Sequence, residues 1–292
     1  MLRPRLLLIG CNGQVGWELE RTLAPMAEVL AVDYPELDLA CSDSIRHWVQ
    51  KTRPEVIVNA AAYTAVDKAE SEPEQAMAIN GTAPGILAQE AKRLGSLLVH
   101  YSTDYVYDGC KRTPYVETDN PAPLSVYGKT KLAGDEAIQA VGGRHLIFRL
   151  CWVYGLRGHN FLLTIQRLAR EREVLRVVRD QVGCPTWSRL IAEATAIALR
   201  QVLASPDPDL FDSVYHLAAS SHITWHEFAQ AIVNALPPEK RKCVQVEPIK
   251  ASEYPTSAKR PAWSVLSCAK LERVFGLKLP SWDEMLDLAL CK

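Results

Sequence analysis

The chain has 292 residues, of which 48% are hydrophobic and 23% are charged, so it can bury a sizeable core and is neither disordered nor fibrous. Lys and Arg total 33 and Asp and Glu total 34, which gives a formal net charge of −1. This balance lacks the overall basic excess of proteins that bind nucleic acid through phosphates. No run approaches the roughly 18 apolar residues of a membrane helix. We therefore expect no nucleic-acid partner and no membrane insertion.

The first apolar segment, residues 6–9, follows Arg3 and Arg5 and precedes Gly10 and Cys11. This order is similar to a bacterial lipoprotein cleavage site. The apolar run is shorter than the roughly 7–15 residues of a signal-peptide core. The segment therefore predicts a buried first strand that leads into a glycine loop.

The cysteines show neither a disulfide framework nor a metal-binding pattern. There are eight of them, and no two form a Cys-x-x-Cys pair. His222 and His226 have i,i+4 spacing, for which a solvent-facing helix start is the favoured interpretation. We expect free thiols in a reducing compartment, hence a cytoplasmic protein, and no metal site.

Short apolar runs alternate with helix-like stretches through the first 150 residues. The predicted strands cover residues 6–9, 29–32, 56–58, 97–100 and 146–150. The predicted helices cover residues 17–23, 44–51, 74–94 and 126–141. Because these strands are too apolar to be half exposed, the alternation predicts a parallel sheet covered on both faces, that is, a Rossmann-type doubly wound α/β fold.

The pattern is looser after residue 150. It predicts helices at 161–171, 190–202 and 225–236, strands at 174–178 and 214–217, a loop at 180–187, and a tail punctuated by prolines. We interpret residues 1–150 as a dinucleotide-binding domain. Residues 151–292 are expected to form mainly a second, smaller mixed α/β substrate domain, with a chain that is free to cross between the two.

A glycine loop follows the first strand. Gly10, Gly13 and Gly16 form the pattern G-x-x-G-x-x-G at the start of a predicted helix. Glycines at this place permit a tight turn and let backbone N–H groups approach a pyrophosphate at the positive end of the helix. The loop predicts a dinucleotide site.

An acidic residue near the end of the second strand supports this prediction. The Asp33 carboxylate can accept hydrogen bonds from an adenosine ribose, although a strand-end turn residue is the alternative interpretation. An acid here favours NAD because it repels a 2′-phosphate. Asp38 and Leu39 would flank the adenine, with the carboxylate accepting from its amino group and the leucine packing on its face.

Two Tyr-x-x-x-Lys pairs compete as the proton-donating group. A neighbouring ammonium lowers the pKa of a phenol by stabilising the phenolate, and i,i+4 spacing aligns the two groups only on a helix. Tyr107 and Lys111 fall in a predicted loop. Tyr127 and Lys131 lie in a predicted helix with Ser125 as its N-cap. We predict that Tyr127 and Lys131 are the catalytic pair.

A further polar group is expected opposite the phenol, where it would polarise a carbonyl. Ser102 and Thr103 end the fourth predicted strand, and the alternation of a strand allows only one of them to face the site. We favour Thr103, with a purely structural hydrogen bond to a neighbouring loop as the alternative.

Together these motifs resemble those of the extended short-chain dehydrogenase/reductases and, more narrowly, those of the dTDP-4-dehydrorhamnose reductase family. The resemblance rests on the glycine loop, on Asp33 and on residues 59–70, 102–109 and 127–131, with 148–149, 152–154, 180–186 and 260–266 in the second half. It spans almost the whole chain.

The resemblance implies a set of binding residues and a reaction. The implied coenzyme contacts are Gly13, Gln14, Val15, Asp33, Asp38, Leu39, Ala62, Tyr63 and Thr64, with Tyr127 and Lys131 on the nicotinamide ribose. Thr103, Asp104 and Trp152 would hold the sugar. The implied reaction is NADPH- or NADH-dependent reduction of the C4 ketone of dTDP-4-dehydro-L-rhamnose. A homodimer is compatible with the resemblance, but no clustered carboxylates predict a bridging metal.

Other functions stay open on the sequence alone. A 4,6-dehydratase resembling this chain would need an acid where Tyr105 stands, which argues against dehydration. A 4-epimerase on the same fold is not excluded. A non-catalytic regulatory subunit is disfavoured by the complete set of Thr103, Tyr127 and Lys131. Consumption of NAD(P)H with a 4-keto-6-deoxy nucleotide sugar distinguishes a reductase from a binding subunit.

Overall fold

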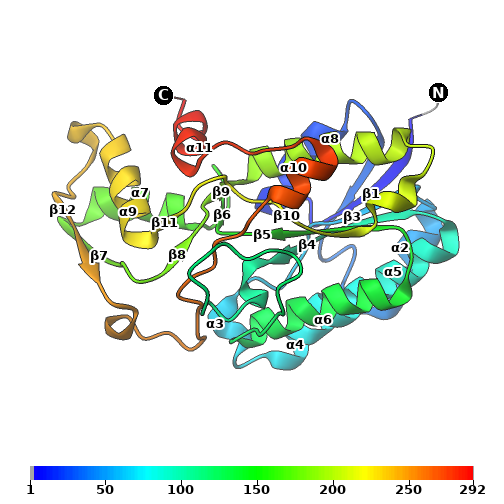
Figure 1. Ribbon diagram of the computed structural model, residues 1–292, viewed down its shortest axis with the longest axis horizontal. Helices are drawn as coiled ribbons and strands as arrows, with labels where there is room; N and C mark the ends of the chain where they lie inside the picture. Colours follow the sequence, from blue (N-terminus) through cyan, green and yellow to red (C-terminus); the bar gives the residue numbers. More distant parts are fainter. Residues whose placement is uncertain (1–2, 292) are drawn as a thin grey trace.

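A computed structural model describes residues 3–291, which form two lobes (Figure 1). The larger lobe is built on a six-stranded sheet in the order β10-β5-β4-β3-β1-β2, and each neighbouring pair is parallel. Its strands are β1 (Arg5–Ile9), β2 (Glu28–Val32), β3 (Val56–Asn59), β4 (Leu97–Thr103), β5 (His145–Leu150) and β10 (Ser213–His216). The predicted Rossmann-type α/β class is confirmed.

The direction in which strands are added reverses between β1 and β3. From β1 the chain adds β2 on one side, and it then returns to place β3 on the other. In open α/β sheets, ligands bind beyond the carboxyl ends of the strands at such a reversal. The glycine loop follows β1 and the segment of residues 60–65 follows β3, so both lie at this point.

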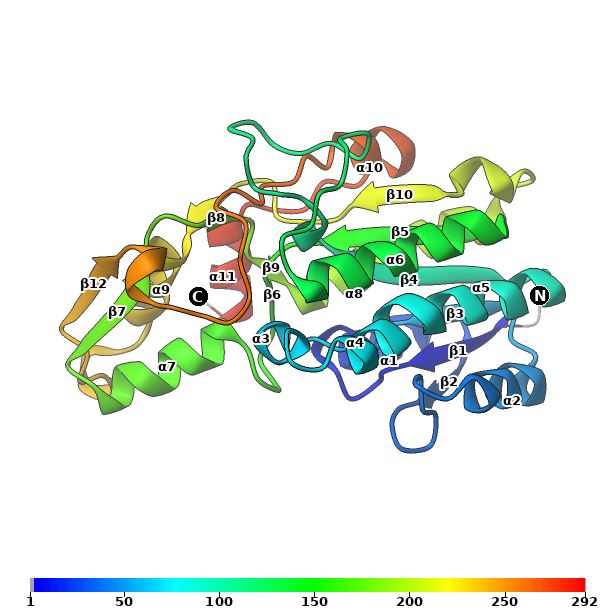
Figure 2. The same cartoon turned by 90° about the horizontal axis from the view of Figure 1, so that it is seen from below.

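Helices cover both faces of the sheet (Figures 1 and 2). One face carries α2 (Ser42–Thr52), α5 (Ala83–Leu94) and α6 (Val126–Val141), and the other carries α1 (Gln14–Leu23), α8 (Ser188–Ala204) and α10 (Ala269–Phe275). Strand alternation divides the apolar side chains between the two layers. In β1, Leu6 and Leu8 join one buried cluster and Leu7 and Ile9 join the other.

The helix predicted at residues 74–94 is divided into three parts. It consists of α4 (Pro73–Met77), a π-helical turn η1 (Ala78–Thr82) and α5, and it follows the short α3 (Val66–Ala69). The π turn lies where α6 approaches most closely. A Cβ atom on Gly134 of α6 would lie 2.2 Å from the carbonyl oxygen of Asn80. Apolar periodicity does not record such a contact between distant segments, so the sequence predicted the helical stretch but not its π-helical turn.

The smaller lobe holds its own apolar core, which includes Leu162, Phe228 and Ile232. Its helices are α7 (Phe161–Glu171), α9 (Trp225–Ala235) and α11 (Trp282–Ala289). Its strands pair as β7 (Val174–Val178) with β12 (Gln245–Ile249), β8 (Val182–Gly183) with β11 (Ile223–Thr224), and β6 (Val153–Tyr154) with β9 (Thr186–Trp187). Across the two lobes, short 3-10 turns occur at η2 (Asp104–Val106), η3 (Pro208–Phe211), η4 (Pro238–Lys240) and η5 (Ala251–Glu253).

The tail contains regular structure that the sequence did not predict, namely β12, α10 and α11. For α11 a local signal was present: Ser281 and Glu284 form a capping box, in which Ser281 N donates to Glu284 Oε2 at 2.8 Å. The prolines of the tail lie mostly between these elements and therefore obscured them.

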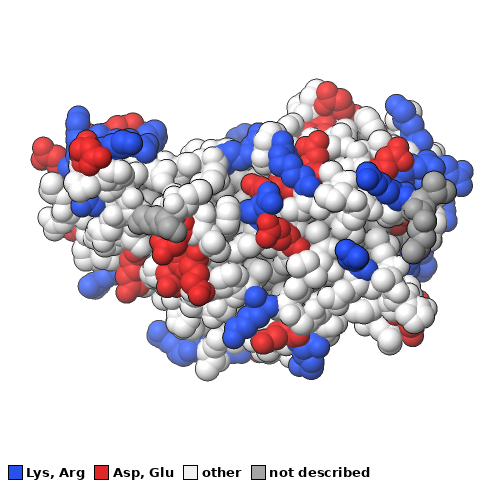
Figure 3. Space-filling model, turned by 90° about the horizontal axis from the view of Figure 1, so that it is seen from above, with Lys and Arg blue, Asp and Glu red and all other residues white. Residues whose placement is uncertain are grey.

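The chain crosses between the lobes. After β9 of the smaller lobe, α8 returns to pack along α1, and β10 then pairs with β5 at the edge of the main sheet. Within residues 3–291 no helix is both long and apolar enough to cross a bilayer. On the face shown in Figure 3, acidic and basic side chains are interspersed, in keeping with the net charge of −1.

Candidate active site

The glycine loop leaves the start of α1 without a side-chain cap. Gly13 is the N-cap residue and makes no side-chain hydrogen bond to the helix. Gly10 has a φ of +86°, and a Cβ atom on Gly16 would lie only 2.0 Å from the carbonyl oxygen of Gly10. The uncapped N–H groups and the missing side chains fit a pyrophosphate at this helix end.

Asp33 lies beside the glycine loop, as predicted from its position after β2. Its Oδ2 accepts a hydrogen bond from Asn12 N at 2.8 Å, and its Oδ1 accepts from Tyr34 N at 2.8 Å. Asp38 Oδ1 accepts from Ala40 N at 2.8 Å, which shapes the next turn. Leu39 is only 8% exposed and packs in the core, so little of its side chain is available to an adenine ring.

The segment after β3 carries Ala62, Tyr63 and Thr64 and is held by a residue that the sequence analysis missed. Asn80 Oδ1 accepts from Tyr63 N at 2.8 Å, and Asn80 Nδ2 donates to Tyr63 O at 3.0 Å. The same amide lies 3.3 Å from Thr130 Oγ1 in α6. Asn80 thus connects the loop to the helix of the predicted catalytic pair. A lone asparagine inside a helical pattern was the only signal that could have revealed it.

Tyr127 and Lys131 lie in the first turns of α6, and Ser125 caps this helix as predicted. Ser125 Oγ accepts from Gly128 N at 3.1 Å. A Cβ atom on Gly128 would lie 2.3 Å from Tyr105 O, so the helix start packs directly against η2, which follows β4. The half-buried Tyr127 ring meets the Tyr105 ring edge-on, with centroids 5.9 Å apart.

The pKa of the Tyr127 phenol is raised rather than lowered. Burial raises it to about 12, and a side-chain hydrogen bond with Thr103 opposes the rise. The Lys131 ammonium instead donates to Tyr101 O at 2.6 Å and lies 3.2 Å from His100 Nε2. The prediction that Lys131 lowers the pKa of the phenol is therefore wrong for the chain by itself, because the ammonium is turned toward β4. Burial also lowers the pKa of Lys131, to about 8.

Ser102 and Thr103 make their contacts in different directions, as strand alternation predicts. Ser102 Oγ donates to Asp135 Oδ2 at 2.9 Å under α6. Thr103 Oγ1 accepts from Tyr105 N at 3.1 Å and donates to Asp104 Oδ1 at 3.1 Å. Of the two hydroxyls, Thr103 is the one beside Tyr127.

Asp104 is a buried carboxyl group that is occupied by its own chain. Its Oδ2 accepts from Cys151 Sγ at 3.1 Å, and its Oδ1 accepts from Thr103. Burial raises the pKa of Asp104 to about 6, and hydrogen bonds from Ser264, Cys151 and Thr103 limit that rise. The structure therefore places Asp104 behind Thr103 rather than on an open surface for a sugar.

One face of the Trp152 ring is covered by another indole. Its φ is +45°, and its indole stacks on Trp225 with centroids 3.4 Å apart and planes 4° from parallel. A Cβ atom on Gly183 would meet Trp152 Cε2, Nε1 and Cδ2 at 2.3–2.7 Å. Gly183 therefore lies in close contact with the Trp152 indole. The Trp152 side chain is only partly buried, and the sugar contact that the resemblance implies for it stays a prediction.

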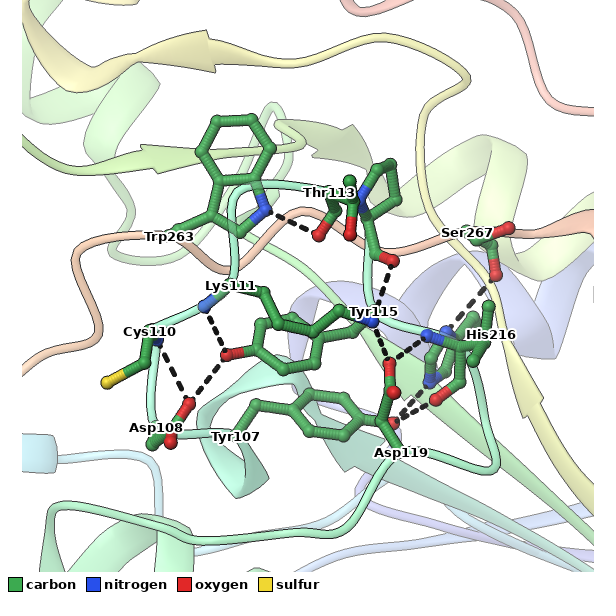
Figure 4. Close-up of polar contacts among 12 residues, drawn as sticks. Tyr107, Asp108, Cys110, Lys111, Thr113, Tyr115, Asp119, His216, Trp263 and Ser267 are labelled. Carbon is green, nitrogen blue, oxygen red and sulfur yellow. Dashed lines mark hydrogen bonds and ion pairs between the residues drawn. The ribbon is translucent and has the colours of Figure 1, made fainter.

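The second Tyr/Lys pair lies in a loop, as predicted (Figure 4). Tyr107 is buried and stacks on Tyr115 with centroids 4.2 Å apart, and its hydroxyl oxygen lies 2.8 Å from His216 Nε2. Lys111 Nζ contacts Asp119 Oδ2 at 2.5 Å. The two side chains do not combine into one site, so Tyr107 is a core residue.

A doubly wound sheet, a glycine loop at its reversal point and a Tyr-x-x-x-Lys helix beside β4 together define a short-chain dehydrogenase/reductase of the extended type. A family model described as the RmlD substrate binding domain matches residues 4–292. The dTDP-4-dehydrorhamnose reductase of Burkholderia thailandensis is 47% identical over 291 residues, covering 98% of each chain. That of Salmonella typhimurium is 45% identical, covering 95% of this chain and 94% of its own.

Solved structures agree. The dTDP-4-dehydrorhamnose reductase of Bacillus anthracis in complex with NADP has a TM-score of 0.89 and 32% identity, covering 99% of both chains. The Thermus thermophilus UDP-glucose 4-epimerase in complex with NAD has a TM-score of 0.80 at 21% identity over 98% of both chains, which shows the shared fold alone. The chain belongs to the dTDP-4-dehydrorhamnose reductase family.

Proposed function

We propose that the chain reduces the C4 ketone of dTDP-4-dehydro-L-rhamnose with NADPH or NADH and forms dTDP-L-rhamnose, a precursor of cell-surface polysaccharide. The observation that carries the proposal is the meeting of Tyr127 and Thr103 at the carboxyl end of β4, with Lys131 one helical turn further on α6. The eight free thiols fit the reducing cytoplasm, where we place the enzyme.

Coenzyme binding is assigned to the crevice between the ends of β1 and β3. The backbone of Gly13, Gln14 and Val15 at the start of α1 would hold the pyrophosphate, and Asp33 the adenosine ribose. The segment of Ala62, Tyr63 and Thr64 would line the other side. We also propose that residues 1–150 hold mainly the coenzyme and that residues 151–292 hold mainly the sugar.

A bound nicotinamide would supply the hydride that reduces C4. Tyr127 would then donate its proton to the developing C4 oxyanion, and the Thr103 hydroxyl would turn from Asp104 to donate a hydrogen bond to the same oxygen. A phenol whose pKa lies near 12 is fully protonated at neutral pH, which is the state that a proton donor needs. Lys131 would contact the nicotinamide ribose and stabilise the phenolate that remains.

Replacement of Tyr127 tests this proposal. Tyr127→Phe should lower kcat by about 10²–10⁴-fold, because the proton donor is lost, and should change coenzyme affinity far less, because only the contact of one hydroxyl with the nicotinamide ribose is lost. Ketone reduction would be followed by NAD(P)H absorbance, and coenzyme affinity by fluorescence titration. Tyr115→Phe, in the loop of Figure 4, is the matched control and should retain wild-type turnover. Unchanged turnover in Tyr127→Phe would contradict the assignment.

The product sugar distinguishes the remaining alternatives. A reductase consumes one NAD(P)H for each ketone and gives the 4-hydroxy-6-deoxy sugar, which NMR identifies. A 4-epimerase regenerates its coenzyme, and a regulatory subunit binds NAD(P)H without consuming it. Dehydration is disfavoured because a tyrosine, Tyr105, stands where a dehydratase would need an acid. The same protein preparation allows sedimentation to test for a homodimer.

A further inference from the structure

A chain of three buried polar side chains ends at Lys131. Asn59 is the last residue of β3, His100 lies in β4, and Lys131 lies in α6, and each is 1% exposed. Asn59 Nδ2 lies 3.2 Å from His100 Nδ1, and His100 Nε2 lies 3.2 Å from Lys131 Nζ. Both nitrogens of the imidazole are therefore engaged, each by a different element.

The chemistry of an ammonium group determines the direction of the second contact. Lys131 Nζ carries three N–H donors and no acceptor. One N–H is donated to Tyr101 O at 2.6 Å. The contact with His100 is a hydrogen bond only if Nε2 offers a lone pair. His100 is then neutral, and its single ring proton is on Nδ1.

The Asn59 amide supplies an independent observation. A protonated Nδ1 needs an acceptor, whereas Asn59 Nδ2 is itself a donor, and Asn59 Oδ1 is buried without a hydrogen-bond partner. The oxygen and nitrogen of an amide exchange places by a half-turn of the side chain. With Oδ1 toward His100, the donor–donor conflict disappears and the orphaned oxygen accepts from Nδ1.

We propose that His100 is a positioning residue for Lys131. As the neutral Nδ1–H tautomer, held by Asn59 Oδ1, it accepts a hydrogen bond from Lys131 Nζ through Nε2. The described residues thus direct two of the three ammonium N–H groups, to Tyr101 O and to His100. The third N–H group of Lys131 remains for the Tyr127 phenol and the coenzyme. The inference rests on the proposed function in so far as that function assigns Lys131 to the coenzyme site.

The charges around the cluster agree with a neutral imidazole. Asp135 follows Lys131 by one turn of α6, is fully buried, and accepts from Arg149 Nε at 3.1 Å and from Ser102. This carboxylate faces two cations, and it raises the pKa of Lys131 against the effect of burial. A third positive charge on His100 would lie beside Lys131 without a carboxylate partner. Burial first, and the Lys131 charge second, hold the pKa of His100 well below its usual range.

The tautomer is measurable on the wild-type chain without substrate or coenzyme. In long-range ¹H–¹⁵N spectra of ¹⁵N-histidine-labelled protein, His100 is assigned as the signal set that is missing from His100→Gln. We expect a protonated Nδ1 and an unprotonated Nε2, unchanged between about pH 5.5 and 7.5, a range in which an ordinary histidine titrates and Lys131 remains an ammonium. An Nε2–H tautomer, or titration within this range, would overturn the inference. The proposed function is tested by ketone reduction, so the two fail separately.

Two amide substitutions test the positioning role. Gln at position 100 places an amide oxygen near the place of Nε2 and can still accept from Lys131, whereas Asn reaches only the place of Nδ1. We expect His100→Gln to keep kcat within a few-fold. His100→Asn should lose about tenfold to a hundredfold, the effect of one charged hydrogen bond, with the KM for the nucleotide sugar unchanged.

Thermal unfolding of both variants identifies any general loss of structure. Equal losses of kcat in His100→Gln and His100→Asn would show that the hydrogen bond to Lys131 is not responsible, and so would overturn the proposal. If one variant fails to fold, the His100 signals are assigned from the spectrum of the other, and the tautomer of the wild-type chain decides.

Discussion

Asp104 shows how one residue can support a site without facing its ligand. Its carboxyl group is enclosed by Thr103, Cys151 and Ser264, so its oxygens orient the Thr103 hydroxyl from behind. Enclosure also disfavours the ionised form, and the pKa rises from 3.8 to about 6. The consequence is a pH-dependent contribution to stability.

Asp104→Asn should remove that dependence. Because the pKa of the folded state lies above that of the unfolded state, the stabilisation is present below about pH 4 and is lost as the pH rises through about 6. The wild type should therefore lose roughly 3 kcal/mol relative to Asp104→Asn across this window. Urea unfolding of both proteins at a series of pH values measures the difference. Parallel stability curves would contradict the prediction.

At the scale of elements, the glycine loop and α1 are the part of the site that local sequence specifies best. Two glycines of the loop have different surroundings. A Cβ on Gly16 would lie 2.0 Å from the Gly10 carbonyl oxygen, whereas a Cβ on Gly13 would lie 3.3 Å from the same atom. The clash at Gly16 is with a backbone atom, so no side-chain movement can relieve it. The contact at Gly13 is tight, but a small shift of the backbone removes it.

Gly16→Ala and Gly13→Ala should therefore distinguish an effect on the stability of the chain from an effect on coenzyme binding. Gly16→Ala should destabilise the chain by about 2 kcal/mol or more and weaken coenzyme binding with it. Gly13→Ala should change stability by only about 1 kcal/mol, since the extended backbone of Gly13 admits a methyl group, but should weaken coenzyme binding because that group meets the pyrophosphate. Thermal unfolding and fluorescence titration measure the two effects. Equal behaviour of the variants would contradict this account.

Elements that bury a continuous face were predictable from the sequence, and contacts between distant segments were not. The strands of the main sheet and α6 with its Ser125 cap follow from apolar periodicity and capping residues. Asn80 and the π turn around it depend on how closely α6 approaches, which no local pattern records. The orientation of Lys131 likewise depends on His100 and Tyr101 in β4, so the site residues were predictable but the direction of the ammonium was not.

At the scale of the whole molecule, an ion pair connects the returning chain to the coenzyme lobe. Arg260 donates to Asp67 Oδ2 at 2.7 Å and to Oδ1 at 3.2 Å, and Ala258 N donates to Oδ1 at 3.0 Å. The same guanidinium also lies close to Tyr105, whose ring packs against Tyr127. The pair therefore joins α3 to the segment that borders the proposed catalytic residues.

Asp67→Asn should loosen this connection. Both partners are partly exposed, so the loss of stability should be small, about 1 kcal/mol or less. We expect a several-fold higher KM for the nucleotide sugar with unchanged coenzyme affinity, because Arg260 would no longer be held beside Tyr105. Glu171→Gln, which breaks an exposed ion pair within α7, is the matched control. A KM equal to that of the control would contradict the prediction.

The path of the chain has a consequence for how the protein folds while it is being translated. The sixth strand of the main sheet and the long helix that lies along α1 are supplied by residues 188–216, far beyond the point at which the first five strands have been translated. A nascent polypeptide of 150 residues would expose the unpaired edge of β5 and the face of the sheet that α8 and α10 later cover. Ribosome-bound chains of this length should therefore bind chaperones and be cleaved readily by proteases until residues 188–216 emerge.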